Sequence, residues 1–297
     1  MNSKARDETF GKITAADLIP DSDTWMTTAR QLFLQRGYVH LLRSQVQIDL
    51  LRLEHECAEL VRLAGNKVSG SKNNTAGLDE GLVVVTEAGN PQQLCRMEYL
   101  AGISSYIKTQ LVRKLATLIE PLILQPVNLF KDKCNFKHAG GGAFPAHQDI
   151  TAYRHFNTRY QVTAAVMLDQ AVLKNGALEM ASHWDVGTPS EATPRGNLPL
   201  LPSHVGGHRN GDILDELSKE MVWEIIEAAP GDVLVFDSYV PHRSQANQSS
   251  NTRRILFFTF NPASEGDLYY EYYRAKWKAP NDPIFHVSTP TVHDATV

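Results

Sequence analysis

The sequence predicts a mainly β fold with peripheral helices, in which a double-stranded β-helix (a jelly-roll or cupin-like barrel) forms the core. From residue 127 onward, helical spacing gives way to short alternating or apolar runs separated by turns, as is typical of strands. His147 and Asp149 are two residues apart, so on an extended chain both side chains face one side of a sheet. His242 can join this pair only from a strand that returns beside the first, as in a two-sheet barrel.

Residues 1–124 are expected to support the barrel, mainly with helices. Apolar residues at helical spacing, together with one N-cap and with Gly and Pro stops, predict the elements. They are a helix over 24–36 ended by Gly37, a strand over 38–42, a helix from the N-cap Ser44 to about residue 63, and a helix over 104–119 stopped by Pro121.

Two long polar segments are predicted to be loops. Residues 65–81 are rich in Gly, Asn, Ser and Lys and are expected to be mobile, as a lid over a site or as a plain surface excursion. Residues 184–221 are irregular and contain several prolines, and a loop of this length is expected to cover the barrel mouth or to serve as an interface.

The barrel core is expected over 125–265, followed by a C-terminal helix and tail over 266–297, in one domain of 1–297. An aromatic helix over 267–278 is predicted to pack on the outside of the barrel. Besides the segment that carries His147, the predicted strands are 128–137, 161–168, 178–181, 223–228, 233–236 and a run from 253, with turns at 174–176 and 230–232.

The composition, with 42% hydrophobic and 21% charged residues, is that of a globular protein. The net charge of −4 gives no electrostatic case for nucleic acid or a membrane surface. No apolar run approaches the roughly 20 residues that span a bilayer, and residues 1–8 lack a signal-peptide core. The three separated cysteines argue against a disulfide framework and favour a reducing cytoplasm.

The candidate metal ligands, and therefore the candidate catalytic centre, are His147, Asp149 and His242. Two imidazoles and one carboxylate on one face of an ion form the facial triad of non-haem Fe(II) oxygenases, which leaves positions open for a co-substrate and O₂. A His-x-Asp pair alone is a weak signal, because such pairs arise by chance, and the alternative is that all three are ordinary polar residues.

The flanking residues strengthen the metal-site interpretation. The three glycines at 140–142 allow a close approach of the backbone. Arg253, eleven residues after His242, opens an apolar strand, and its planar fork is suited to gripping a carboxylate. Arg254 competes for this role, and because neighbours on a strand point to opposite faces, only one of the two arginines can enter the barrel.

Several segments together resemble the phytanoyl-CoA dioxygenase (PhyH-like) superfamily of Fe(II)/2-oxoglutarate oxygenases. The matching segments are 141–149, 168–169, 175–179, 230–236, 241–244 and 253–254, which spread over 125–265. Within that superfamily, residues 236–244 and 261–268 are most similar to members that hydroxylate small organophosphonates.

The resemblance implies Fe(II), 2-oxoglutarate as co-substrate, and O₂. It favours Arg253 over Arg254 for the far carboxylate of 2-oxoglutarate, with Ser244 supporting the same carboxylate and Phe144 packing beside it. Strand 128–137 lines the co-substrate pocket in related enzymes, and Asn135 is the expected contact there.

The resemblance also implies the reaction: hydroxylation of an unactivated C–H bond, with release of succinate and CO₂. Halogenating relatives replace the carboxylate ligand by a small residue, so the presence of Asp149 argues against halogenation. Desaturation, epoxidation and ring formation use the same centre and stay open.

The candidate substrate contacts are Gln148 between the ligands, Tyr153 just past them, and the pair Arg96 and Glu98. The last two share one face of a predicted strand and either offer opposite charges to a zwitterionic substrate or form a surface ion pair. Basic side chains that could converge on the barrel mouth are Arg96, Lys133, Lys137, Arg154 and Arg159.

Three functional classes follow from these observations. The first is a hydroxylase of a small polar molecule, with an aminoalkylphosphonate as its most specific version. The second is a tailoring oxygenase of a larger natural product, and the third is a non-catalytic binding barrel. The expected partner is a small molecule, and the expected assembly is a monomer or homodimer.

Overall fold

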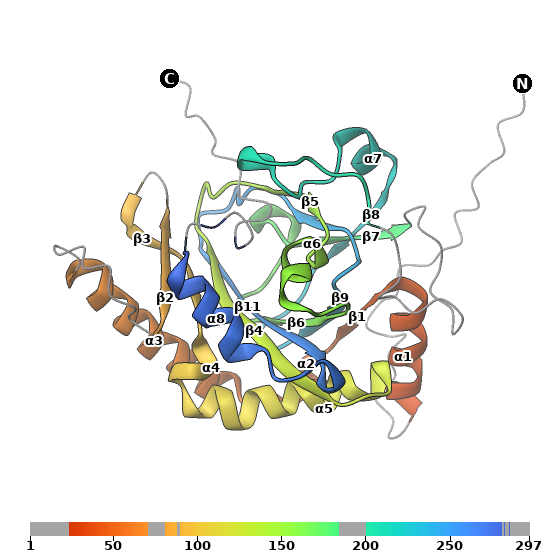
Figure 1. Ribbon diagram of the computed structural model, residues 1–297, viewed down its shortest axis with the longest axis horizontal. Helices are drawn as coiled ribbons and strands as arrows, with labels where there is room; N and C mark the ends of the chain where they lie inside the picture. Colours follow the sequence, from red (N-terminus) through yellow and green to blue (C-terminus); the bar gives the residue numbers. More distant parts are fainter. Residues whose placement is uncertain are drawn as a thin grey trace, which may run out of the picture.

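Two antiparallel sheets lie opposite each other and form the barrel of the protein (Figure 1). The computed structural model describes residues 24–70, 81–87, 90–183 and 200–280, together with 282 and 285. Among these residues, the larger sheet has the order β1-β9-β6-β11-β4-β3-β2 and the smaller sheet the order β5-β10-β7-β8. The mainly β, two-sheet barrel predicted from the sequence is confirmed.

The strands of the larger sheet are β1 (Tyr38–Leu41), β2 (Val83–Glu87), β3 (Asn90–Glu98), β4 (Val127–Lys137), β6 (Val162–Met167), β9 (Val233–Asp237) and β11 (Arg253–Pro262). Those of the smaller sheet are β5 (Phe144–His147), β7 (Leu178–His183), β8 (Val222–Ile226) and β10 (His242–Ser244). Strand β2 has no counterpart among the predicted elements.

The inner face of the larger sheet is apolar over most of its width and cationic along β4. Strand β11 pairs with β4, and Arg253, Phe257 and Thr259 lie opposite Lys137, Lys133 and Lys131. Side chains that face each other across paired strands point to the same side of the sheet. The apolar part of this face packs against the smaller sheet, in a buried cluster that includes Tyr38, Ala165, Met167, Ala177, Met180, Leu234, Phe236, Val240, Ile255 and Phe257.

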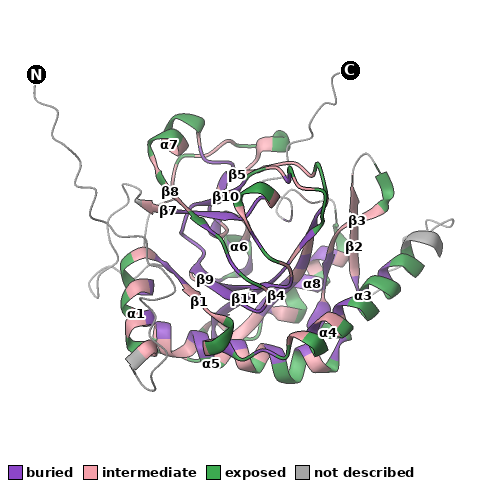
Figure 2. Ribbon diagram, turned by 180° about the vertical axis from the view of Figure 1, so that it is seen from behind, coloured by how far each residue is buried: buried purple, intermediate pink, exposed green. Residues whose placement is uncertain are grey.

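Helices cover the outer face of the larger sheet and bury its other side chains, as the purple segments of Figure 2 show. Phe33, Leu53 and Leu115 belong to one buried cluster with Val235 and Leu256 of the sheet. Each such large apolar side chain stabilises the fold by about 1.5–3 kcal/mol when fully buried. The helices are α1 (Thr24–Arg36), α2 (Arg43–Val46), α3 (Leu50–Gly70), α4 (Leu100–Ile103), α5 (Val112–Ile123), α6 (Ile150–Tyr153), α7 (Asp215–Glu220) and α8 (Tyr269–Lys278), with a π-helical turn at Ile107–Leu111.

The predicted helix beginning at Ser44 is wrong in its start. Ser44 lies inside a short helix, α2, which ends at Val46, and Gln47 adopts a left-handed conformation with φ of 55° before α3 begins. Asp49 caps α3, since its Oδ1 accepts a hydrogen bond from the backbone N–H of Arg52 at 3.0 Å. Helix α3 continues to Gly70, so the first part of the loop predicted at 65–81 is helical, and residues 71–80 of that loop lie outside the described residues.

Pro121 does not stop a helix as predicted, because it lies inside α5. The proline falls in the last turn, where it removes the hydrogen bond that its N–H would donate to the carbonyl four residues earlier. Leu118, Ile119 and Leu122 around it are buried against the core, and this packing outweighs the unfavourable helix propensity of proline. The helix ends at Leu124, whose φ is 55°.

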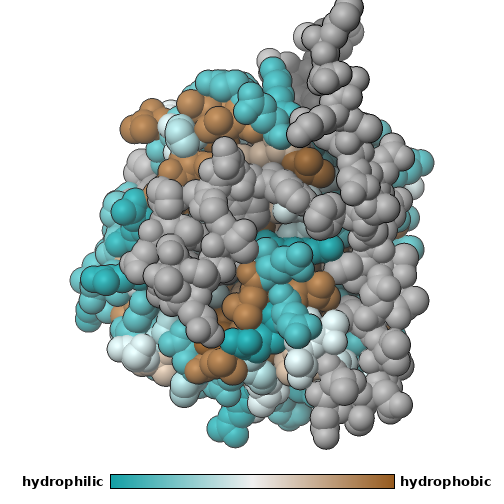
Figure 3. All heavy atoms as spheres, turned by 90° about the vertical axis from the view of Figure 1, so that its right-hand side faces the viewer, coloured by the Kyte–Doolittle hydropathy of each residue, from teal (hydrophilic) through white to brown (hydrophobic). Residues whose placement is uncertain are grey.

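The segment predicted as an irregular loop over 184–221 is partly ordered. Its residues 184–199 lie outside the described residues, whereas the remainder contains α7 and pairs with the edge of the smaller sheet. The backbone N–H of Ile213 donates to the carbonyl of Ala146 at 2.7 Å, so this segment lies directly beside β5. On the face seen in Figure 3, the hydrophobic residues of the described ranges form separate groups with hydrophilic residues between them.

Among the described residues, no helix combines the length and the apolar character that crossing a membrane requires. The aromatic helix predicted at 267–278 is confirmed as α8, which packs on β4. Its rings join a buried cluster, in which Tyr272 meets Phe130 edge-to-face with centroids 5.1 Å apart.

Candidate metal centre

His147, Asp149 and His242 converge at one end of the smaller sheet. His147 ends β5 and His242 begins β10, and the two residues are cross-strand partners. Oδ1 of Asp149 lies 3.7 Å from Nε2 of His147 and 3.8 Å from Nε2 of His242. Metal–imidazole bonds are about 2 Å long, so atoms at these separations can reach a single ion.

Both imidazoles are held in the tautomer that a metal ligand needs. Nδ1 of His147 lies 2.8 Å from the carbonyl of Pro145, and Nδ1 of His242 lies 3.1 Å from the carbonyl of Val240. Because a carbonyl only accepts, each Nδ1 carries the proton and each Nε2 presents its lone pair. Burial, with the charge of His242 second, lowers the pKa of His147 to about 3, which keeps this imidazole neutral.

The structure corrects the expectation that His147 and Asp149 lie on one extended strand. Strand β5 ends at His147, and Asp149 has φ −60° and ψ −32°, a helical conformation that precedes α6. The two ligands therefore meet because the chain turns from strand to helix at Gln148. The amide of Gln148 is buried at this turn, where it donates to the carbonyl of Tyr239 at 2.8 Å and accepts from the N–H of Leu201 at 2.9 Å.

A buried cationic pocket lies beside the metal centre, at the end of β4. Arg253 is 3% exposed, and its guanidinium donates to the carbonyl of Gly176 while its Nε has no hydrogen-bond partner among the described residues. Lys137, opposite it across the strands, donates to Oγ of Ser244 at 2.7 Å and lies 5.2 Å from the ring centroid of Phe144. These are the residue types that bind a carboxylate.

Burial makes both cations of this pocket costly to keep charged. Burial lowers the pKa of Arg253 to about 10. Burial, followed by the charge of Arg253, lowers the pKa of Lys137 to about 7. An anion bound between them would offset both costs. Arg254 points away, and its fork binds Asp169 with Nε···Oδ2 of 2.8 Å and Nη2···Oδ1 of 2.7 Å.

Gly176 makes the close approach of chains around this pocket possible. Its φ is +74°, and a Cβ at this position would lie 2.3 Å from the carbonyl oxygen of Gln245 and 3.0 Å from Nζ of Lys137. A side chain here would therefore collide with the strand that carries Ser244 and would displace the lysine. The predicted turn at 174–176 thus shapes the pocket as well as joining two strands.

Residues 79–255 match the family described as Phytanoyl-CoA dioxygenase (PhyH), which is more than half of the chain. This chain belongs to the PhyH family. The resemblance predicted from the sequence is confirmed.

Two relatives of this PhyH chain have names that state an activity on phosphonates. A "2-aminoethylphosphonate dioxygenase" of Uncultured bacterium HF130_AEPn_1 is 33% identical over 187 residues, 62% of this chain. A "Methylphosphonate hydroxylase" of Gimesia maris is 36% identical over 182 residues, 61% of this chain. The chain spans 64% of the length of each of these relatives.

Solved structures share the jelly-roll fold. The epimerase SnoN in complex with Fe3+, alpha ketoglutarate and nogalamycin RO is 15% identical, with a TM-score of 0.58 over 92% of this chain and 98% of that one. EctD from S. alaskensis with 2-oxoglutarate and 5-hydroxyectoine is 19% identical, with a TM-score of 0.55 over 83% and 78% of the two chains. At these identities the likeness shows the fold of the PhyH chain.

The other predicted contacts lie along β4 and its neighbours. Asn135 lies opposite Ile255 on the inner face, and its buried Oδ1 has no hydrogen-bond partner within the described ranges. Tyr153 is 3% exposed. Burial and then the charge of Asp149 raise the pKa of Tyr153, so its hydroxyl stays protonated beside the metal centre.

Arg96 and Glu98 form a buried ion pair, and the surface ion pair considered from the sequence is wrong. Glu98 is 1% exposed, and its Oε1 lies 2.7 Å from Nε of Arg96 and 2.6 Å from Nζ of Lys276 in α8. Burial raises the pKa of Glu98, but the charges of Lys276 and Arg96 outweigh burial and hold it well below its ordinary value. Lys276 is 178 residues after Glu98 in the chain, so no local sequence pattern indicated this contact.

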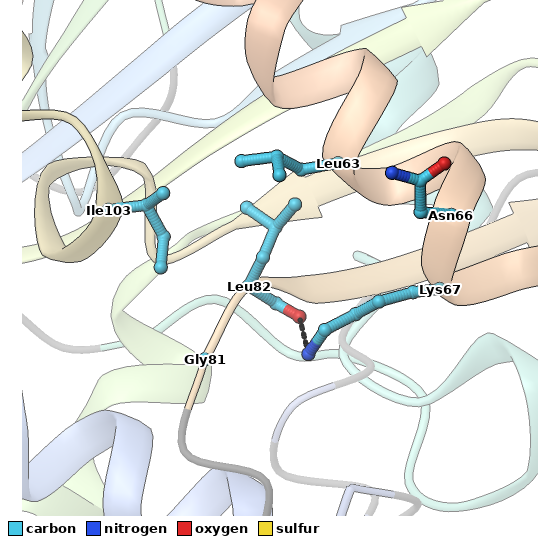
Figure 4. A pocket seen from close by; sticks show the side chains of 6 residues that line it. All are labelled: Leu63, Asn66, Lys67, Gly81, Leu82 and Ile103. Atoms are coloured by element: carbon cyan, nitrogen blue, oxygen red, sulfur yellow. Dashed lines mark hydrogen bonds between the residues drawn. The ribbon is translucent and has the colours of Figure 1, made fainter. Parts of the chain in front are cut away.

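A separate hollow lies on the outside of the barrel, between α3, the start of β2 and α4 (Figure 4). The ammonium of Lys67 at its edge donates to the carbonyl of Leu82 at 3.2 Å. This hollow is mostly apolar and contains none of the metal-centre residues. Its lining residues are Leu63, Asn66, Lys67, Gly81, Leu82 and Ile103.

Proposed function

We propose that this PhyH-family chain is an Fe(II)- and 2-oxoglutarate-dependent dioxygenase that hydroxylates an unactivated C–H bond of a small polar molecule, releasing succinate and CO₂. The observation that carries the proposal is the convergence of His147, Asp149 and His242 beside the buried cations of Lys137 and Arg253. A bound Fe(II) would supply the oxidation chemistry with O₂.

The residues around the centre hold the reactants in place. The backbone carbonyls of Pro145 and Val240 fix the two imidazoles, and Asp149 adds the negative charge that a divalent cation requires. Arg253 and Lys137 would hold the far carboxylate of 2-oxoglutarate, which orients the keto-acid end towards the three ligands. Ser244 already accepts a hydrogen bond from Lys137 and would fix the ammonium in this role.

The named activities of the two relatives support a phosphonate as the substrate, with an aminoalkylphosphonate as one version and methylphosphonate as another. The tailoring of a larger natural product is the alternative from the sequence, and the structural neighbours of that kind share only the fold at 15% identity. A non-catalytic binding barrel would have no use for the complete ligand set.

The test is succinate formation by protein loaded with Fe(II) under anaerobic conditions and then given 2-oxoglutarate and O₂. The panel contains methylphosphonate, 2-aminoethylphosphonate, free amino acids, acyl-CoA esters and aromatic alkaloids. We expect a phosphonate to stimulate succinate release, and His242→Ala to abolish the stimulation. Stimulation by an alkaloid alone would move the protein to the tailoring class, and failure to bind Fe(II) would overturn the proposal.

A further inference from the structure

Two lysines on the inner face of β4, Lys131 and Lys133, contact aromatic rings but form no ion pair with any of the described residues. Lys131 is 8% exposed, and its ammonium lies 5.2 Å and 5.1 Å from the ring centroids of Tyr153 and Tyr272. The ammonium of Lys133 lies 4.9 Å from the ring centroid of Phe257. Within the described part of the chain, neither ammonium has a hydrogen bond or an ion pair within 4.0 Å.

Buried ammonium groups without a partner are unfavourable, and aromatic faces offset only part of their desolvation. Burial, followed by the charge of Lys133, lowers the pKa of Lys131 well below its ordinary value. Burial also lowers the pKa of Lys133. An anion held between the two ammonium groups would offset this cost.

The carboxylates near Lys131 and Lys133 already have other partners. Glu98 contacts Lys276 and Arg96, and Asp149 belongs to the metal centre. Asp132 accepts hydrogen bonds from the N–H groups of Leu100 and Ala101 at 2.7 and 2.8 Å. The cluster of Arg96, Lys131, Lys133 and Lys276 therefore holds four basic side chains against the single carboxylate of Glu98.

The position of this surplus charge separates it from the co-substrate pocket. Lys137 is four positions after Lys133 along β4, which is about 13 Å of extended chain at the usual rise per residue. One 2-oxoglutarate carboxylate held at Lys137 cannot also satisfy Lys131 and Lys133. Lys131 nevertheless lies near the metal centre, because its ammonium contacts the ring of Tyr153, which ends the short helix that starts directly after Asp149. Lys133 is two positions further along the same face of β4.

We propose that Lys131 and Lys133 form an anion-binding subsite that holds a doubly charged phosphonate group of the substrate beside the metal centre. The inference rests on the proposed function and names the group that the substrate presents. A tetrahedral dianion has three oxygens that can accept from two ammonium groups at once. Lys276 and Arg96 already neutralise Glu98. Glu98 therefore positions these two cations and does not bind a substrate ammonium.

The experiment compares the binding of methylphosphonate with that of methanesulfonate, which has the same tetrahedral shape and one negative charge fewer. Titration calorimetry is run at about pH 8, where most of the methylphosphonate is doubly charged and methanesulfonate is a monoanion. The protein is used in its metal-free form and loaded anaerobically with Fe(II) and 2-oxoglutarate. The variants are Lys131→Met, Lys133→Met and, as a matched control, Lys219→Met on the exposed surface of α7.

We expect the wild-type protein to bind methylphosphonate at least about tenfold more tightly than methanesulfonate, a difference of 1.4 kcal/mol. Each β4 variant should lose about tenfold in methylphosphonate affinity and keep its affinity for 2-oxoglutarate within about twofold, whereas Lys219→Met should change neither. The thermal midpoint of Lys131→Met should stay level or rise, because the variant removes an unpartnered buried cation. A lysine that only supported the fold would give a lower midpoint.

Three results would overturn the subsite. They are equal affinity for the two anions, unchanged methylphosphonate affinity in both variants, and a loss of 2-oxoglutarate affinity in place of phosphonate affinity. Failure of the proposed function shows up separately, as absence of Fe(II) or 2-oxoglutarate binding by the wild-type protein. The metal-free titrations then still report on the lysines: tight binding that depends on them supports an anion site, and absent binding refutes it.

Discussion

His147 and His242 face each other across adjacent strands, with ring centroids 4.2 Å apart. Each ring lies against a backbone carbonyl two residues before it in the chain, at Pro145 and at Val240. The same local arrangement therefore occurs on both strands, and it directs both Nε2 atoms towards Asp149. Hydrogen bonds to backbone carbonyls therefore fix the orientation of both imidazoles.

Replacing a ligand should abolish metal binding without unfolding the protein. Loss of groups that merely support a ligand costs about 10–100-fold in metal affinity, so Asp149→Asn and His242→Ala should each cost more than about 100-fold. Titration with Fe(II) under anaerobic conditions measures the affinity, and circular dichroism checks the fold. Wild-type Fe(II) affinity in both variants would show that the three residues are not the ligands.

The neighbouring arginines provide a matched pair for the co-substrate pocket. Arg253→Ala should raise the KM for 2-oxoglutarate by about 100-fold or more, because a bidentate, buried charge-assisted contact is lost. Arg254→Ala removes an equal charge, but its partner is Asp169 on the other side of the sheet, so KM should change by less than about threefold. A large rise for Arg254→Ala alone would reverse the assignment.

The affinity for 2-oxoglutarate should fall as pH rises above neutrality. Burial and the charge of Arg253 lower the pKa of Lys137 to about 7, although Glu179 opposes this shift. Above that pH the free protein loses the Lys137 proton, which a bound carboxylate would require, so binding must take up a proton and weakens by up to about tenfold per pH unit. Lys137→Met should bind more weakly at neutral pH and lose most of this slope. Dissociation constants for 2-oxoglutarate, measured from about pH 6 to pH 9, test this prediction. If Lys137→Met shows the same pH dependence as the wild-type protein, another group is responsible for it.

The sequence predicted the parts of the site that depend on local spacing. The segment from Phe144 to Asp149 and the segment from His242 to Ser244 carry their motif in consecutive residues, and the structure brings both together. Asn135, the contact expected on strand 128–137, lies on the inner face of β4 together with Lys133 and Lys137. The turn of the chain at Gln148 was missed, because the His-x-Asp spacing fits an extended chain as well as a strand followed by a helix.

What the sequence could not predict is the set of partners that long-range packing selects. Glu98 and Arg96 appeared as an isolated pair, and only the fold brings Lys276 of α8 into contact with them. Lys131 gave no signal as a pocket residue, because it becomes buried only when Tyr153 and Tyr272 pack around it. A pocket assembled from several segments leaves no pattern in the linear sequence. The metal-ligand motif can be found because its residues are close together in the sequence.

Asp132 joins β4 to the helices that cover it. The carboxylate of Asp132 is fully buried and accepts from the N–H groups of Leu100 and Ala101, which begin α4, and from the hydroxyl of Tyr269 at 3.0 Å. Asp132→Ala leaves these donors buried without an acceptor, and each such group costs about 1–3 kcal/mol, so the free energy of unfolding should fall by about 3 kcal/mol or more. Asp132→Asn keeps one acceptor oxygen and should lose less.

Urea denaturation followed by circular dichroism measures the change through the transition midpoint. Glu271→Ala, which removes an exposed carboxylate from α8, is the control and should change the free energy of unfolding by less than about 0.5 kcal/mol. A midpoint for Asp132→Ala equal to that of the control would mean that water replaces the carboxylate at this joint. The free energy of unfolding should be lowest for Asp132→Ala, higher for Asp132→Asn and highest for the wild-type protein. The three side chains offer none, one and two acceptor oxygens to the same donors.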